Sequence, residues 1–452
     1  MTGQPLTVGI HQTSENTMLL PASFKQDGLL FAAFGTSVER CHVSFDSHLK
    51  RTVLLSENLY KNLRIPYRGK ASLIFRDNTV YIGPLIGIFT AGFTKSQLDP
   101  VRGRSLFFSK LLTMDLPAGG YSYLFGAHQI DWEEGTVQAL IFRENGWEEA
   151  TVPLPNVVYD RLPNRKAEES AALRETKTRL MDEYRIPWFN PGFFNKWEIY
   201  KCLQQDERTA ELLPFSALEP DAGKIEDMIG QYGFIYVKPA GGSLGKGILQ
   251  LSKREENGIL ARHAEGVTSY SSAAECLDEW QRLHKHTSYL AQQGIERIEV
   301  DHHPADFRVH TNKNGKGQWT VTAIAVKIAG KDGITTHMSS GGAVKTLAEL
   351  YDDPQERLHT LQKLTKAALL LSRVLDEKLD GFIGEIGFDL GLDRSGKVWL
   401  FEANSRPGRG IFSHPRLASV SSLTKKRSFE YASYLTEQSI LNPEDMWHDL
   451  KP

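Results

Sequence analysis

Residues 381–408 constrain this chain more than any other segment, because they have the pattern of a β-hairpin with acids at fixed places. Strand side chains alternate between two faces. A two-residue turn at Ser395-Gly396 would place Asp389 directly opposite Glu402, with their Cβ atoms about 5 Å apart. A glycine-bulge loop over residues 393–396 would shift this register by about one residue. The alternation predicts Leu400, Glu402 and Asn404 on one face of the second strand, and Trp399, Phe401 and Ala403 on the other.

This register predicts a metal site. Two carboxylates at that distance repel by roughly 3 kcal/mol at an effective dielectric constant of about 20, which a protein tolerates when a cation lies between them. Asp389, Glu402 and Asn404 together offer the all-oxygen ligands that suit Mg²⁺. The alternative is a solvated polar face on an edge hairpin.

A glycine-rich loop upstream is the second chemical signal. Residues 234–237 and 248–251 have the pattern of strands, and the loop Ala240-GGSLGKG lies between them. Backbone N–H groups in such a loop can cradle an anion, and Lys238 and Lys246 add positive charge. Ala240 and Gly247 stand where a Walker A motif needs Gly and Ser or Thr. We therefore predict a hairpin flap over phosphates, with a plain flexible hairpin as the alternative.

Composition narrows the class of protein. The 452 residues indicate two to four domains, and the net charge of −2 gives no indication of nucleic acid or a membrane surface as a partner. No apolar run is long enough to span a bilayer, and the first residues lack the pattern of a signal peptide. Three widely spaced cysteines, Cys41, Cys202 and Cys276, fit a reducing compartment. We expect a cytoplasmic protein.

The secondary-structure pattern changes along the chain. Residues 1–85 have mostly β-strand patterns, with one short helix beginning at Ser56. Strands and helices alternate over 86–190, with a charged helix over 166–184 and a connection over 156–164. The remainder contains a capping box at Asn195 and a long amphipathic helix that begins at Asp353-Pro354. These patterns predict an α+β, multidomain fold.

Residues 190–415 resemble the ATP-grasp superfamily and, within it, the YheC/YheD branch, whose members are described as endospore coat-associated. An aspartate thirteen residues before E-x-N is the metal-ligand spacing of the superfamily, and Asp389, Glu402 and Asn404 meet it. The chain departs from the branch at His337-Met338, where relatives commonly have Asn-Leu, and at residues 301–306. The closer match is carried by residues 193–203, 289–297, 306–319, 337–343 and 401–408.

The secondary-structure patterns and the resemblance together predict four domains. They are a β-rich N-terminal domain over 1–85, an α/β pre-ATP-grasp-like domain over 86–190, an ATP-grasp nucleotide-binding catalytic domain of two α+β subdomains over 191–415, and a C-terminal helical extension over 416–452.

The resemblance also implies roles for individual residues. Arg308, Lys238, Lys327 and Arg406 would be catalytic, with Arg308 facing the γ-phosphate or acyl phosphate and Arg406 or Arg409 binding a substrate carboxylate. Asp301 is an alternative to Glu299 for the ribose. ATP would contact Lys196, Lys238, Gly241, Gly242, Ser243, Leu244, Gly245, Lys246, Gly247, Gln292, Gln293, Gly294, Ile295 and Glu299, and Mg²⁺ would be held by Asp389, Glu402 and Asn404.

The expected activity is ATP- and Mg²⁺-dependent ligation. A carboxylate would be activated as an acyl phosphate and then attacked by an amine, a thiol or a similar nucleophile. The resemblance implies peptides or amino acids as substrates and action on components of the spore coat or envelope. Spore coat proteins would be partners. Two alternatives stay open: a nucleotide-binding scaffold of the spore coat without ligation, and an ATP-grasp phosphotransferase.

Overall fold

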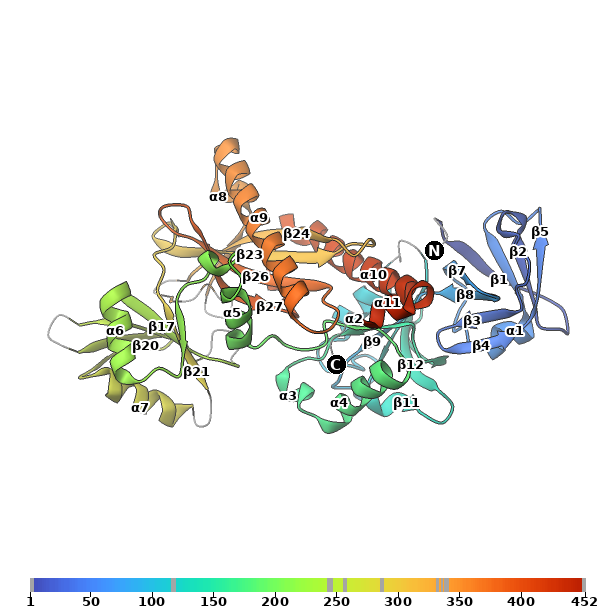
Figure 1. Ribbon diagram of the computed structural model, residues 1–452, viewed down its shortest axis with the longest axis horizontal. Helices are drawn as coiled ribbons and strands as arrows, with labels where there is room; N and C mark the ends of the chain where they lie inside the picture. Colours follow the sequence, from blue (N-terminus) through green and yellow to red (C-terminus); the bar gives the residue numbers. More distant parts are fainter. Residues whose placement is uncertain are drawn as a thin grey trace.

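The computed structural model describes residues 4–114, 119–241, 247–254, 258–284, 288–330, 333–334, 336 and 341–448. Within them the chain forms four β-sheets with helices packed on their faces, which confirms the predicted α+β class. The first sheet lies at one end of the long axis and the third at the other (Figure 1). No helix in these ranges has both the length and the apolar character needed to cross a bilayer. The division into four domains remains a prediction.

The first sheet is formed by the predicted β-rich segment. Its strand order is β4-β3-β8-β7-β1-β6-β2-β5. Ser56 caps helix α1 (Glu57–Asn62) by accepting a hydrogen bond from the backbone N–H of Leu59, which confirms the predicted helix start. The strands are β1 (Leu6–His11), β2 (Thr17–Pro21), β3 (Phe31–Phe34), β4 (Ser37–Arg40), β5 (His42–Asp46), β6 (Thr52–Ser56), β7 (Lys70–Arg76) and β8 (Thr79–Gly83).

The second sheet has a parallel centre. Its order is β11-β12-β10-β9-β14-β15, with β13 paired to β12, and β10, β9, β14 and β15 run parallel. The strands are β9 (Leu85–Phe89), β10 (Tyr121–Phe125), β11 (Ile130–Asp131), β12 (Thr136–Arg143), β13 (Gly146–Pro153), β14 (Val157–Asp160) and β15 (Trp188–Phe189), and the helices are α2 (Ser105–Leu112), α3 (Arg165–Glu168) and α4 (Ala171–Thr178).

Two predictions for this region are wrong. The segment 156–164, predicted as a connection, contains the buried strand β14, which lies between β9 and β15. The single helix predicted over 166–184 is instead α3, α4 and a π-helical turn over Arg179–Glu183. Ser170 has the extended backbone typical of a helix N-cap, so a new helix begins there.

The third sheet has the order β16-β21-β17-β18-β19-β20 and packs against two helices. Its elements are β16 (Ser216–Leu218), β17 (Phe234–Pro239), β18 (Leu249–Lys253), β19 (Ile259–His263), β20 (Gly266–Tyr270), β21 (Tyr289–Gln293), α6 (Ala222–Tyr232) and α7 (Ala273–Leu283). Helix α5 (Lys196–Gln204) precedes them and packs against the fourth sheet, where Ile199 and Leu203 enter the core.

The fourth sheet lies at the centre of the molecule (Figure 1). Its order is β25-β24-β23-β26-β27, with β22 paired to β23. Helix α9 packs on one face through Leu364, Ala368 and Leu371, while α10 contacts both β23 and the second sheet. The elements are β22 (Glu299–Val300), β23 (His303–Lys313), β24 (Trp319–Ile328), β25 (Ala343–Lys345), α8 (Leu347–Leu350), α9 (Pro354–Lys378), β26 (Glu385–Leu392), β27 (Val398–Asn404), α10 (Ala418–Leu441) and α11 (Pro443–His448).

Candidate active site

The hairpin of β26 and β27 sets Asp389 opposite Glu402, as predicted, and Gly387 opposite Asn404. The two-residue turn does not form, because the last pair is Leu392 with Val398, and the chain takes the alternative glycine-bulge loop over residues 393–396. The carboxylate of Asp393 accepts hydrogen bonds from the backbone N–H groups of Ser395 and Lys397, and Gly396 has a φ of +77°. These contacts fix a longer loop with a left-handed glycine.

A β-bulge restores the predicted pairing. The register shifts between Asp389 and Leu390, so Leu390 faces Leu400 while Asp389 faces Glu402. Phe401 is the extra residue, and the loop and the bulge therefore cancel each other. The predicted alternation of the second strand fails here, because Leu400 and Ala403 both enter the same hydrophobic core.

Asp389 lies at the centre of a charged cluster on one face of the sheet. Arg308, its partner across the β23–β26 pair, donates from Nε to Oδ1 at 2.8 Å and from Nη2 to Oδ2 at 3.0 Å. The Nζ atom of Lys327 lies 3.0 Å from Oδ1. Although burial opposes ionisation, Arg308 and Lys327 hold the pKa of Asp389 below its usual range.

Asp306 is a second acid of this cluster and was not predicted. Its Oδ1 lies 3.1 Å from Nζ of Lys327, and its Oδ2 accepts a hydrogen bond from Thr336 and lies 3.7 Å from Arg297. Burial lowers the pKa of Lys327, but Asp306 and Asp389 outweigh it, so the net shift is upward. The alternation Asp306, Arg308 in one strand places both side chains on the same face, and this pattern could have revealed the acid.

Glu402 and Asn404 lie on the more accessible side. Nζ of Lys196 is 3.0 Å from Oε1 of Glu402, whose side chain is 30% exposed. Asn195 caps α5 and places Lys196 in its first turn, which confirms the predicted helix start. Within the described parts of the chain, the Asn404 amide has no hydrogen-bond partner.

Lys238 joins the third and fourth sheets. Its Nζ donates to Oε1 of Gln292 at 2.8 Å and to the backbone oxygen of Phe401 at 3.3 Å. Burial lowers the pKa of Lys238 to about 8, with Lys196 contributing and Glu402 opposing the shift. A narrow cavity lies beside it, lined among others by Lys196, Lys238, Gln292 and Glu402.

The predicted hinge residues follow this cavity along the chain. Gln293 and Gly294 donate backbone hydrogen bonds to Phe215 and Phe234, and Ile295 is buried. A Cβ on Gly294 would lie 2.3 Å from the Phe234 ring, so this position requires glycine. Glu299 is exposed on β22, and Asp301 follows it at a positive φ of 53°. Their contacts with adenine and ribose remain predictions.

The flap prediction is tested only at its edges. Strands β17 and β18 flank the loop, as expected, and pair antiparallel. Gly241 is exposed, and Gly247 has a φ of +72° and accepts a hydrogen bond from Trp280. Gly242, Ser243, Leu244, Gly245 and Lys246 lie outside the described residues.

Arg406 lies apart from the cluster around Asp389. Its guanidinium is 2.9 Å from Asp160 and 2.7 Å from Glu168, stacks over Phe193 and is 3% exposed. These contacts connect the end of β27 with the second sheet. The catalytic role of Arg406 remains a prediction, and its carboxylate partners here belong to the chain itself.

The donor set fits magnesium. Asp389, Glu402 and Asn404 supply only oxygen ligands from paired positions on adjacent strands, and one of them is an amide without a partner in the described ranges. In the described ranges, no three His, Cys, Asp or Glu side chains are arranged to hold a metal together, and this site offers two acids and an amide.

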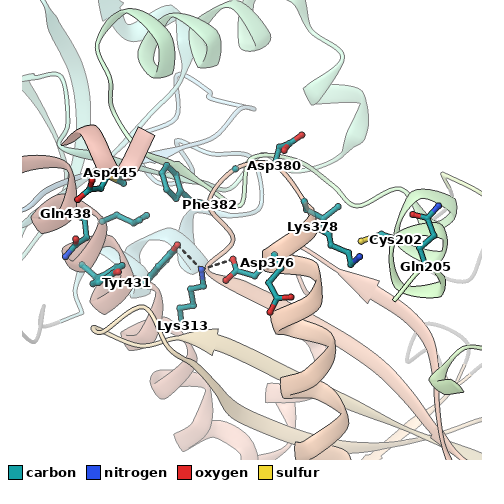
Figure 2. Close-up of a pocket in the computed structure, with 16 residues that line it drawn as sticks. Cys202, Gln205, Lys313, Asp376, Lys378, Asp380, Phe382, Tyr431, Gln438 and Asp445 are labelled. Atoms are coloured by element: carbon teal, nitrogen blue, oxygen red, sulfur yellow. Dashed lines mark hydrogen bonds and ion pairs between the residues drawn. The ribbon is translucent and has the colours of Figure 1, made fainter. Parts of the chain in front are cut away.

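A separate cavity of about 670 Å³ lies near the ends of α9 and α10 (Figure 2). At its wall, Nζ of Lys313 lies 2.7 Å from Oδ1 of Asp376 and 3.4 Å from the Tyr431 hydroxyl. Lys313 and Arg308 both belong to β23, but Lys313 pairs with Asp376 of α9, whereas Arg308 pairs with Asp389 of β26. None of the predicted site residues lines this cavity.

Comparison with known proteins finds a matching family, two similar proteins and a similar solved structure. A family described as YheC/D like ATP-grasp matches residues 185–435, which confirms the resemblance. The endospore coat-associated protein YheD of Bacillus subtilis (strain 168) is 60% identical over 97% of this chain and 98% of its own length. YheC of the same strain is 24% identical over 58% of this chain and 73% of its own length. The D-alanine-D-alanine ligase structure from Coxiella burnetii aligns with a TM-score of 0.46 and 11% identity, over 80% of this chain and 99% of that one.

Proposed function

The chain belongs to the YheC/D-like ATP-grasp family, and from this premise we propose that it is an ATP- and Mg²⁺-dependent ligase. One observation carries the proposal. Asp389 and Glu402 face each other beside Lys238, and three further cations pair with them: Arg308 and Lys327 with Asp389, and Lys196 with Glu402. Asp306 adds a third acid, paired with Lys327. Such a cluster can neutralise a triphosphate and the metal that accompanies it.

ATP would bind between the third and fourth sheets. Lys238 and Lys196 would pair with its phosphates, and Gln292 to Ile295 would lie beside the adenine. Asp389, Glu402 and Asn404 would hold Mg²⁺, which when bound neutralises charge on the phosphates. In the present structure the two acids are paired with Arg308, Lys327 and Lys196. Ligand binding would thus change the partners of these charged groups: the acids would bind the metal, and the cations would pair with the phosphates.

The chemistry requires positioning and charge rather than a covalent nucleophile. A substrate carboxylate oxygen attacks the γ-phosphorus, ADP leaves, and an acyl phosphate forms. An amine then attacks the acyl carbon, phosphate leaves, and the amine loses a proton to give the amide. Arg308, held by two hydrogen bonds to Asp389, would face the transferred phosphoryl group and stabilise its negative charge.

ADP release tests this proposal. The purified protein is incubated with Mg²⁺-ATP and panels of amino acids, peptides and other carboxylates. The proposal predicts ADP release that depends on both a carboxylate and an amine, and a new amide product by mass spectrometry. Glu402→Gln should abolish this ADP release. Glu57→Gln is its matched control, because Glu57 pairs with Lys61 in an exposed glutamate–lysine contact of the first sheet region.

A spore coat scaffold is the second candidate. The observation in its favour is the name of the 60% identical relative, an endospore coat-associated protein. Binding and turnover separate the two. ATP at 100 times its dissociation constant should stabilise the fold by about 2.7 kcal/mol. Stabilisation without turnover on any substrate supports the scaffold. A phosphorylated product without amide formation supports a phosphotransferase.

A further inference from the structure

Lys327 lies between two buried acids, only one of which belongs to the proposed metal site. Its Nζ atom is 3.0 Å from Oδ1 of Asp389 and 3.1 Å from Oδ1 of Asp306. All three side chains are at most 12% exposed. Asp389 is a proposed magnesium ligand, whereas Asp306 lies outside the proposed ligand set. In this structure one lysine therefore neutralises a proposed metal ligand and a second acid at the same time.

The register of the fourth sheet places Lys327 next to Asp306. These residues of β24 and β23 are direct cross-strand partners, so their Cβ atoms are about 5 Å apart. Asp389 belongs to the next strand, β26, where its direct partners are Arg308 and Glu402. Lys327 reaches Asp389 only across β23. Asp306 therefore stays beside Lys327 when Asp389 changes its partners.

The carboxylate of Asp306 is held by two other segments of the chain. Its Oδ2 accepts a hydrogen bond from the Thr336 hydroxyl and lies 3.7 Å from Nη1 of Arg297. Arg297 is 9% exposed and also donates to the Tyr236 hydroxyl of β17 at 3.4 Å. The other oxygen, Oδ1, is buried and accepts no hydrogen bond from the described residues. Asp306 is thus fixed in place with one oxygen still able to accept a hydrogen bond from Lys327.

Lys327 and Mg²⁺ would compete for the same oxygen of Asp389. The lysine ammonium lies at Oδ1, and two cations near one buried carboxylate repel each other with little screening by water. The open Oδ1 of Asp306 gives the ammonium a second acceptor. An ammonium has three N–H donors, so the others stay free for a phosphate. Lys327 can therefore release Asp389 without losing a carboxylate partner.

We infer that Asp306 is a positioning residue of the proposed metal site: it holds Lys327 when Asp389 binds Mg²⁺, and so keeps this lysine from competing with the metal. The inference rests on the proposed ligase function. Without the Asp306 charge, Lys327 has Asp389 as its only carboxylate partner among the described residues. Metal affinity should then fall by about 10–100-fold, as is common for residues that act behind the ligands of a metal.

Binding of Mn²⁺ in place of Mg²⁺ tests the inference without nucleotide or turnover. The electron paramagnetic resonance signal of free Mn²⁺ gives the dissociation constant for the full chain and for Asp306→Asn. We expect the constant to rise about tenfold or more in the variant. Asp376→Asn is the matched control, because Asp376 also pairs with a lysine of β23, Lys313 at 2.7 Å, but at the separate cavity of Figure 2. Its constant should equal that of the wild type.

The Lys327→Met background shows whether Asp306 acts through Lys327. The competing cation is gone in this background, so Mn²⁺ should bind more tightly, and Asp306→Asn should raise the constant there by no more than about threefold. An equal rise in both backgrounds, or no rise in the presence of Lys327, would overturn the inference. If Asp306→Asn does not fold, Lys327→Met alone is measured. Tighter binding of Mn²⁺ in that variant supports the inference, and unchanged or weaker binding overturns it.

Glu402→Gln separates the inference from the proposed function. This variant removes a proposed ligand, so it should lose Mn²⁺ binding. Binding that is unchanged in Glu402→Gln, or absent from the wild-type chain, contradicts the metal site and overturns both. Binding that is lost in Glu402→Gln but unchanged in Asp306→Asn overturns the inference alone.

The Mg²⁺ dependence of ADP release is an independent measurement. We expect Asp306→Asn to raise the half-saturating Mg²⁺ concentration about tenfold, while KM for the carboxylate substrate stays unchanged. Excess Mg²⁺ should restore most of the maximal rate, because Lys327 and the proposed ligands are still present. A maximal rate that is low at every Mg²⁺ concentration would indicate a merely structural role and contradict the inference.

Discussion

Two acids of strand β26, Asp389 and Glu385, face the same way four residues apart but have different surroundings. The partners of Asp389, Arg308 and Lys327, belong to strands of the same sheet. Glu385 is 1% exposed and accepts hydrogen bonds from Tyr159 and Arg161 of the second sheet. One acid thus belongs to the proposed reactive centre, and the other connects two parts of the molecule.

The difference separates an acid that could take part in the reaction from an acid that holds two sheets of the chain together. Asp389 lies beside the accessible Glu402, so its cations could turn toward a ligand without opening the fold. Glu385 has no such route, because its side chain is 1% exposed, against 12% for Asp389, and it is held by Tyr159 and Arg161 of the second sheet. Buried ion pairs of similar geometry should therefore respond differently to substitution.

Glu385→Gln should produce the largest change in stability. It leaves Arg161 and Arg409 buried without a carboxylate, so we expect the free energy of unfolding to fall by about 3–5 kcal/mol. Urea denaturation measures this. In the control Glu265→Gln, an exposed acid paired with His263, the change should stay within about 0.5 kcal/mol. A loss similar to the control would contradict the assembly role.

Glu402→Gln should show the opposite pattern. We expect turnover to fall about 100-fold or more, because a ligand for the metal and its charge are lost. The free energy of unfolding should change by no more than about 1 kcal/mol, since only one partly exposed ion pair is broken. Paired kinetic and denaturation measurements check both. Unchanged turnover would eliminate the metal assignment.

Arg406→Lys distinguishes a connecting arginine from a substrate-binding one. Lysine cannot reproduce contacts with both Asp160 and Glu168, so we expect a loss of about 2 kcal/mol in the free energy of unfolding. KM for the carboxylate substrate should not change. A raised KM with unchanged stability would instead support the catalytic role implied by the resemblance.

The pH dependence of ATP binding should be the smallest of these effects. Lys238 has a pKa of about 8, so it is charged below that pH and neutral above it. We expect ATP affinity to be constant below pH 8 and to fall by up to about tenfold per pH unit above it, because binding then requires proton uptake. Calorimetry at several pH values measures this slope. Lys238→Arg should remove it, and an unchanged slope in that variant would assign the proton to another group.

The sequence predicts the local features of the site and misses its long-range contacts. The hairpin pattern identifies Asp389 and Glu402, which face each other on adjacent strands, and the family resemblance adds Arg308. The predicted Asp389–Glu402 pair is right although the two-residue turn does not form, because the Phe401 bulge offsets the longer loop.

Contacts between distant segments leave no local pattern. Arg161 and Glu385 are 224 residues apart, and their pairing depends on how the second and fourth sheets pack.

Strand β14 was missed because of its own short sequence. It is a four-residue buried strand next to prolines, so its length and flanks are typical of a connection.

The most direct measurement of the central claim is a crystal structure with a non-hydrolysable ATP analogue and Mn²⁺ in place of Mg²⁺. The account predicts an anomalous peak at about 2–2.3 Å from oxygens of Asp389 and Glu402, with the phosphates next to Lys238. A bound nucleotide whose metal lies away from these two acids, or whose phosphates lie away from Lys238, would contradict it.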